Sequence, residues 1–194
     1  MVDIRLRNMV GIWLHWNSSM VQVEVLSLME QEIDVLLQVQ SLSFSWILSD
    51  IYASPKFENM CILWENLKKV SNHHDLPWIL MGDFNEVLEE SEKLGGNPLS
   101  IRRVQEYKES MNYCNLLDLG FSRPKFTWTN KRGIRNLIQE RLDRCWVNPS
   151  WKLLLLEASV SHLARINSDQ CLLLLKLLEP PPFSGERPFH FQPM

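Results

Sequence analysis

The spacing of apolar residues changes part-way along this chain, and that change constrains the fold more than any other feature. Over residues 21–25, valines alternate with polar residues, which is the period of a half-buried strand. Between Met60 and Leu67 the apolar positions recur at i, i+3, i+4 and i+7, which is the period of one helix face. A chain with both periods is expected to form packed layers of strands and helices.

The same analysis along the whole chain predicts a mixed α/β (α+β) domain. Strands are expected over residues 21–25, 46–52, 77–81, 116–119, 126–129, 142–147, 159–163 and 171–178, and helices over residues 60–67 and 101–114 and from Asn148-Pro149. Strand and helix do not alternate strictly, which disfavours an all-parallel doubly wound sheet. Neither GxGxxG nor GxxxxGK[ST] occurs, so these two nucleotide-binding loops are excluded.

Composition limits the class of protein further. A length of 194 residues favours one domain, and 45% hydrophobic with 22% charged residues excludes a wholly disordered chain. The net charge of -3 excludes a protein held to nucleic acid by overall basicity. The four cysteines are separated by 53, 31 and 26 residues without a CxxC pair, so we expect reduced core thiols rather than a zinc ribbon or a disulfide framework.

Targeting signals are weak. No run of 18 apolar residues occurs, so no membrane span is expected, and the apolar run over residues 9–14 is too short for a signal peptide. An intracellular protein is therefore the expectation. Residues 179–194 begin with a glutamate followed by three consecutive prolines and are expected to form a tail or linker.

Two polar clusters beside apolar strands could carry chemistry. Asp83 and Asn85 directly follow a buried strand, where Asp83 could accept a proton and Asn85 could bind a phosphate oxygen. The structural alternative is that both only cap a turn. Asp143 lies within an apolar strand and needs a partner if it is buried. Its alternative is an exposed strand face on which Arg141 and Arg144 are ion-pair partners.

Further candidates are weaker individually. Asp169 and Gln170 open the strand predicted over residues 171–178, as loop residues commonly do, and Tyr52 ends the strand predicted over residues 46–52. Residues 123–144 contain seven Lys and Arg against two acidic residues, a net charge of +5. Basic residues interleaved with aromatic ones are typical of a phosphate-backbone contact, although a solvated charged face is the alternative. The candidate nucleic-acid contacts in this stretch are Trp128, Arg132, Arg135 and Arg141.

Several motifs stand in order along the chain: GIWLHW (11–16), IYASP (51–55), PWILMGDFN (77–85), SEKLGG (91–96), DLGF (118–121), FTWTN (126–130), IQERLDR (138–144), Ser168-Asp169 and RPFHF (187–191). Together they resemble the endonuclease/exonuclease/phosphatase superfamily, in the version found in plant LINE-type (non-LTR) retrotransposon polyproteins. The resemblance covers about residues 10–191. It implies a two-sheet sandwich with flanking helices, here a domain over residues 9–178.

The resemblance also implies an activity, Mg²⁺-dependent hydrolysis of DNA phosphodiesters, and a nuclear location. By matching positions, Asp83 resembles the residue that orients or deprotonates the attacking water, and Asn85 and Tyr52 resemble phosphate contacts. Asp143 resembles the carboxylate that orients a catalytic histidine, and Asp169 resembles a Mg²⁺ ligand. These side chains are expected to meet in one pocket. The metal would polarise the phosphoryl oxygen while a carboxylate prepares the water.

Two departures from the family pattern argue against full activity. The family motif Ser-Asp-His reads Ser168-Asp169-Gln170 here, and glutamine cannot carry a proton near pH 7. The chain also starts downstream of two family strands, one of which ends in a metal-binding glutamate, so weakened Mg²⁺ binding and an open pocket wall are expected. Gln170 is expected beside Asp143. The interpretation is a truncated endonuclease domain with little or no activity; the alternative is a non-catalytic nucleic-acid-binding or interaction module. The oligomeric state stays open.

Overall fold

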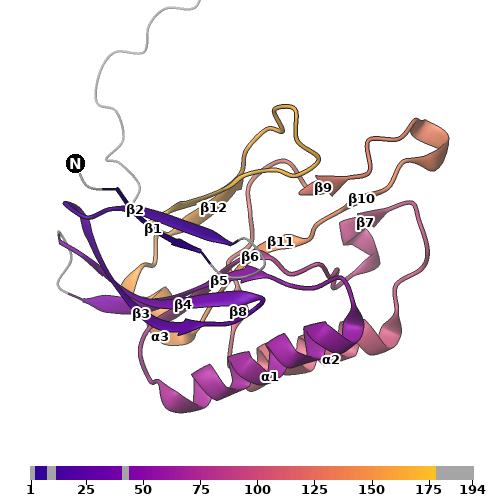
Figure 1. Cartoon of the computed structure of the whole chain (residues 1–194). Coiled ribbons are helices and arrows are strands. Elements are labelled where there is room, and N and C mark those ends of the chain that lie inside the picture. The colour runs from indigo at the N-terminus through magenta and orange to yellow at the C-terminus, as the bar shows by residue number, and fades with distance from the viewer. Residues whose placement is uncertain (1–2, 8–11, 41–43, 178–194) are drawn as a thin grey trace, which may run out of the picture.

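A six-stranded sheet forms the centre of the computed structural model, which describes residues 3–7, 12–40 and 44–177 (Figure 1). In spatial order its strands are β3 (Val21–Leu28), β4 (Glu32–Val39), β5 (Ser45–Tyr52), β6 (Trp78–Asp83), β11 (Asp143–Val147) and β8 (Leu117–Asp118). β5 and β6 run parallel and are joined by the helix α1 (Phe57–His73), whereas the other neighbours pair antiparallel.

Two helices, α1 and α2 (Ile101–Tyr113), lie side by side over one face of this sheet (Figure 1). All four apolar positions predicted between Met60 and Leu67 are buried, as the helical period requires. The ring of Trp64 stacks on that of Tyr107 with 4.8 Å between centroids, and Trp146 Nε1 donates to the Tyr107 hydroxyl at 2.9 Å. This aromatic cluster joins both helices to β11.

The other face of the sheet carries two separate two-stranded ribbons (Figure 1). They consist of β1 (Asp3–Arg7) with β2 (Trp13–Asn17), and of β12 (Ser159–His162) with β13 (Leu173–Lys176). Leu14 of the first ribbon packs with Ile33 and Val35, while Leu175 of the second packs with Trp46 and Ile79. The predicted sandwich with flanking helices is confirmed.

The remaining elements are short. They are a small sheet of β7 (Lys93–Leu94), β10 (Gln139–Glu140) and β9 (Trp128–Thr129), the 3-10 turns η1 (Glu90–Glu92) and η2 (Ile134–Asn136), and the helix α3 (Pro149–Leu154). α3 begins as Asn148-Pro149 predicts, because the Asn148 side chain accepts from Trp151 N at 2.9 Å. All four cysteines are free thiols. Within the described ranges, no helix has the length and apolarity needed to cross a membrane.

Several strands were not predicted, β2 and β4 among them, and several predicted strands were too long: residues 116–119 contain only β8, and residues 171–178 contain only β13. β2 lacks a clear period of two. β4 has one, since Ile33 and Val35 alternate with Glu32 and Asp34, but all four of these residues are buried, so its polar residues do not mark a solvent-exposed face. The strand predicted over residues 126–129 contracts to β9. The predicted tail, residues 179–194, lies outside the described residues, as do residues 9–11 and Leu178.

A buried network of four charged side chains joins the small sheet to the large one. Arg141 donates to Glu92 Oε1 at 2.9 Å and to Asp118 Oδ2 at 2.9 Å. Arg144 pairs with the same two carboxylates. Arg141 is only 5% exposed, so its prediction as a nucleic-acid contact is wrong: its charge is paired with Glu92 and Asp118 inside the fold. The two arginines also do not pair with Asp143, contrary to the sequence alternative.

Replacing one acid of this network should destabilise the protein. Glu92→Gln leaves two buried guanidinium groups with one carboxylate, and we expect the free energy of unfolding to fall by about 3 kcal/mol. Urea denaturation measures it. Glu90→Gln, at an exposed position two residues away, is the control and should change the stability by less than about 0.5 kcal/mol. Equal effects of the two substitutions would contradict the structural role of the network.

Two further buried acids, Glu32 and Asp34, lie in β4, where burial raises the pKa of Glu32 to about 8 and that of Asp34 to about 6. Both values exceed those of an unfolded chain, so protonation favours the folded state. This stabilisation is complete below the unfolded pKa values and is lost as the pH rises through the folded ones. Burial also raises the pKa values of Asp50, Asp83 and Asp143, which act in the same direction, whereas His162, whose pKa burial lowers, acts in the opposite direction.

The free energy of unfolding should therefore decrease between pH 5 and pH 8, by roughly 2–4 kcal/mol. Glu32→Gln removes the largest contributor and should make this decrease visibly shallower. Chemical denaturation of both proteins across that pH range tests the expectation. A stability that rises with pH in the unmodified chain would show that these carboxyl groups are not buried as described.

Candidate active site

Three neighbouring strands present the predicted site residues in one row. Asp83 at the end of β6 stands opposite Tyr52 of β5 on one side and Asp143 of β11 on the other. Residues in register on adjacent strands project from the same face, here the face that carries the ribbons. Gly82 permits the close approach of β5 and β6, because an added Cβ would lie 2.1 Å from the Ile51 carbonyl oxygen.

The chain turns sharply after Asp83, and this turn fixes the carboxylate. Asp83 Oδ1 accepts from Asn85 N at 2.8 Å, and Asn85 has a positive φ of 48°, which asparagine tolerates better than most residues. Asn85 Nδ2 donates to the Ala53 carbonyl at 2.6 Å. The turn-capping alternative is thus realised, and the capped carboxylate is the one that points into the pocket described below.

Gln170 contacts Asp83 directly. Its Nε2 donates to Asp83 Oδ2 at 2.7 Å, so both carboxylate oxygens of Asp83 have donors. The segment that holds Gln170 pairs with β9 and the residue before it. Thr129 N donates to the Asp169 carbonyl at 3.0 Å, and Cys171 N donates to the Thr127 carbonyl at 2.8 Å. We expected Gln170 beside Asp143; its hydrogen bond goes instead to Asp83.

Asp143, at one end of this row, is buried. It is 8% exposed, and burial together with the charge of Asp83 raises its pKa to about 7. Burial also raises the pKa of Asp83, although the bonds from Asn85 and Gln170 oppose that effect. Thr127 holds the backbone at this point, since its Oγ1 accepts from Asp143 N at 3.1 Å. Within the described part of the chain, no donor reaches Asp143 Oδ2.

A cavity of about 330 Å³ brings most of the predicted residues together: it is lined by Tyr52, Pro55, Asp83, Asn85, Trp128, Glu140, Leu142, Asp169 and Gln170. Asp143, on the neighbouring strand β11, does not line it. A second cavity of about 700 Å³ opens beside Asp83 and Gln170, between Trp13 of the first ribbon and Leu172 next to the second. The pocket is therefore open on the side that faces the ribbons.

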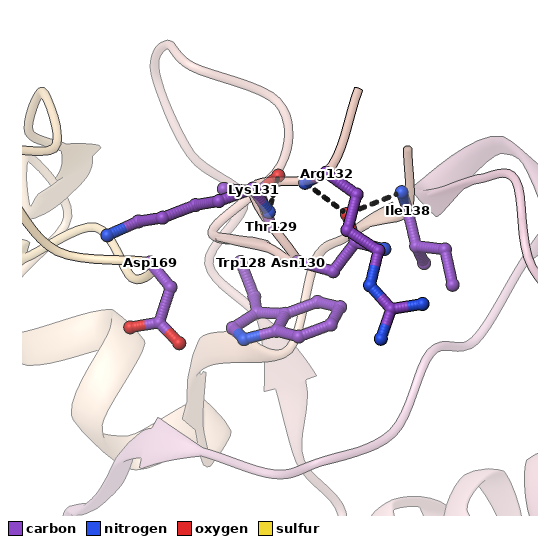
Figure 2. A pocket seen from close by; sticks show the side chains of 7 residues that line it. All are labelled: Trp128, Thr129, Asn130, Lys131, Arg132, Ile138 and Asp169. Carbon is purple, nitrogen blue, oxygen red and sulfur yellow. Dashed lines mark hydrogen bonds between the residues drawn. The ribbon is translucent and has the colours of Figure 1, made fainter. Parts of the chain in front are cut away.

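A more basic cavity of about 610 Å³ adjoins the first and shares Trp128 and Asp169 with it. Figure 2 shows the Trp128 indole between the Asp169 carboxylate and the Arg132 side chain, with Lys131 above. Arg135 is exposed in η2, in the loop that joins β9 to β10 (Figure 1). Two of the four predicted nucleic-acid contacts, Trp128 and Arg132, thus line this cavity, Arg135 is exposed in the same loop, and Arg141 is buried.

The residues present offer a divalent cation few ligands. Among the described residues, no three His, Cys, Asp or Glu side chains converge in a metal-binding arrangement. Asp169 is exposed and borders both cavities, whereas both oxygens of Asp83 already accept hydrogen bonds. Such a donor set fits a hydrated Mg²⁺ held by one carboxylate and its own waters, since Mg²⁺ commonly keeps several waters in proteins.

Comparison with solved structures shows the same fold in a retrotransposon endonuclease domain and in TDP2 proteins. The endonuclease domain of TRAS1, a telomere-specific non-LTR retrotransposon, is 13% identical with a TM-score of 0.62, and the match covers 89% of this chain and 78% of that one. TDP2 from C. elegans is 16% identical with a TM-score of 0.52, covering 88% of this chain and 54% of that one. D. rerio TDP2 complexed with single strand DNA product is 11% identical with a TM-score of 0.51, covering 87% and 72%.

Sequence comparison places the chain in a family. No curated protein sequence matches it. The sequence model of the Endonuclease/Exonuclease/phosphatase family, however, matches residues 7–165, which include the strands that carry Tyr52, Asp83 and Asp143. Since this match spans most of the chain, the protein belongs to the endonuclease/exonuclease/phosphatase family.

Proposed function

We propose that this chain binds the phosphodiester backbone of DNA across the Asp83 cavity and the adjoining basic cavity, and hydrolyses it with little or no efficiency. The observation that carries the proposal is the hydrogen bond from Gln170 Nε2 to Asp83 Oδ2. An amide at this position donates to the carboxylate but cannot accept the proton that leaves an attacking water. Asp83 is thereby also a poorer acceptor, because both of its oxygens are engaged.

The other residues are suited to holding a phosphodiester. The Tyr52 side chain is 45% exposed at the rim of the cavity, where its hydroxyl can donate to a phosphate oxygen. Trp128 offers a ring face for a base, and Lys131 and Arg132 offer positive charge to the backbone. Mg²⁺, held by Asp169, would supply charge neutralisation at the phosphate. The structural similarity to D. rerio TDP2, which was solved with single strand DNA product, supports DNA as the ligand class.

Restoring an ionisable group should restore activity. Gln170→His places an imidazole beside Asp83, and Asp143, whose Oδ2 lacks a donor among the described residues, is the carboxylate available to orient it. We expect Mg²⁺-dependent nicking of supercoiled plasmid to increase by about 10²–10⁴-fold, the usual contribution of a positioned general base or acid.

The double variant Gln170→His/Asp83→Ala is the matched control and should be inactive. Two results would count against the proposal. If the unmodified chain already nicks plasmid as fast as Gln170→His, and Asp83→Ala abolishes that cleavage, the glutamine does not impair catalysis. If the cleavage persists in Asp83→Ala, it does not come from this site.

A second candidate function, a binding module without catalysis, is favoured by the basic cavity around Trp128, because binding there needs no proton transfer. DNA affinity without nicking, both in the unmodified chain and in the Gln170→His variant, would support it. Both candidates require that DNA contacts this surface.

DNA affinity should fall steeply with salt and depend on the loop between β9 and β10. Arg132→Ala and Arg135→Ala should each weaken binding and reduce the slope of log affinity against log salt by about 1. Fluorescence anisotropy with a short labelled duplex, titrated at several salt concentrations, measures both quantities. Lys108→Ala, an exposed cation of α2 on the helical side, is the control and should leave the slope unchanged. Identical slopes in all four proteins would remove this surface from the proposal.

A further inference from the structure

A further cavity, lined by two buried acids, lies on the opposite, helix-covered face of the sheet. It measures about 200 Å³ and is lined by Glu32 and Asp34 of β4, by Met29, and by Lys69 and Val70 of α1. Glu32 and Asp34 alternate along β4 with Ile33 and Val35, which pack against the ribbon side. Their side chains therefore project away from the Asp83 row, and this cavity is separate from the candidate active site.

Two carboxylate oxygens of these acids are sealed from solvent next to the cavity and lack donors. Glu32 is 1% exposed and Asp34 is 2% exposed, and in the described part of the chain no donor reaches Glu32 Oε2 or Asp34 Oδ2. Leaving such buried acceptors unpaired costs stability, on the order of 1–3 kcal/mol each. A ligand that brings N–H donors would remove that cost.

The orientation of Asp34 is fixed independently of any ligand. Trp78 Nε1 donates to Ser49 Oγ at 2.9 Å, and Ser49 Oγ in turn donates to Asp34 Oδ1. This relay occupies one carboxylate oxygen and leaves Oδ2 as the free one. The site is therefore prearranged at its base rather than a chance gap between flexible side chains.

The two acids select for positive charge. They share one face of β4 two residues apart. Burial, with a smaller contribution from the charge of Asp34, raises the pKa of Glu32 to about 8, although a hydrogen bond with the Asn66 side chain opposes this shift. Lys69 is exposed and contributes charge at the mouth, but it does not reach Glu32 Oε2. His73 and His74 also border the mouth, yet no three metal-ligating side chains converge among the described residues. This favours an organic cation over a metal ion.

We propose that this cavity binds an organic cation, a primary ammonium or guanidinium group on a short aliphatic stem. Its N–H groups donate to Glu32 Oε2 and Asp34 Oδ2, and its stem lies against Met29 and Val70. At about 30 Å³ for each water-sized group, 200 Å³ holds about six or seven such groups, which suits a stem of four carbons.

The experiment titrates the full chain at pH 8.5 with butylammonium, butylguanidinium or butanol at constant ionic strength, and follows the methyl resonances of Met29 and Val70 by NMR. We expect saturable shifts with at least one of the two cations and none with butanol. The cation that saturates at lower concentration identifies the head group. Equal shifts with butanol would show a merely apolar cavity and overturn the proposal.

Variants make the test specific. Glu32→Gln keeps the shape of the side chain and removes its charge, and should weaken cation binding at least tenfold, while Glu30→Gln, at an exposed position, should leave it unchanged. Lys69→Met removes a competing charge at the mouth and should bind the cation at least as tightly as the unmodified chain. Undiminished binding in Glu32→Gln, or loss of binding in Lys69→Met, would overturn the proposal; the amide spectrum of each variant confirms that it is folded.

Discussion

The antiparallel register of β6 and β11 sets Asp83 opposite Asp143, and the rest of the site depends on that placement. Opposite residues of such a pair have Cβ atoms about 4.5–5.5 Å apart, where two buried negative charges repel strongly. The fold limits the repulsion in two ways. The pKa of Asp143 is raised to about 7, so it is protonated below that pH. Asp83 accepts hydrogen bonds from Asn85 and Gln170. Gln170 is thus part of the charge balance of this chain as well as an obstacle to proton transfer.

β11 separates opposite charges across the sheet. Asp143 faces the ribbon side, whereas the next residue, Arg144, faces the helical side, where it is 1% exposed and bound to Glu92 and Asp118. Because those two acids come from η1 and β8, the arginine holds two distant segments against β11. Thr127 Oγ1 accepts from Asp143 N in the same region, next to Trp128. The walls of both cavities therefore depend on the stability of β11.

The sequence was a good guide to which residues meet and a poor one to how they bond. Of the five side chains that the motifs predicted to meet in one pocket, Tyr52, Asp83, Asn85 and Asp169 line one cavity, whereas Asp143 does not. The partner of Gln170 was beyond reach, because it depends on how the segment before β13 pairs with β9. Arg141 was misassigned for a similar reason. The charge count over residues 123–144 does not include Glu92 and Asp118, which lie earlier in the chain. These two acids neutralise the charge of Arg141.

β4 illustrates a different limit. Sequence patterns assume that polar residues mark the solvent side of a strand, and Glu32 and Asp34 break that assumption by lying buried under α1. The alternation of Ile33 and Val35 with these acids is present in the sequence, but it does not show that both faces of the strand are covered. The error is informative, because burying two acids is costly and few positions in a fold tolerate it.

The two faces of the sheet pose opposite electrostatic problems for a ligand. On the helical face, Glu32 and Asp34 lie beneath a cavity where an organic cation would lower the cost of their burial. On the ribbon face, a phosphodiester must approach Asp83, and the two negative charges repel each other. A proton on Asp143 or a cation at Asp169 can offset this repulsion. The neighbouring Lys131 and Arg132 can also offset it. The basic cavity supplies that offset without any proton transfer. Affinity for DNA and hydrolysis of DNA therefore rest on different side chains, and a chain with glutamine at position 170 can keep the first while losing the second.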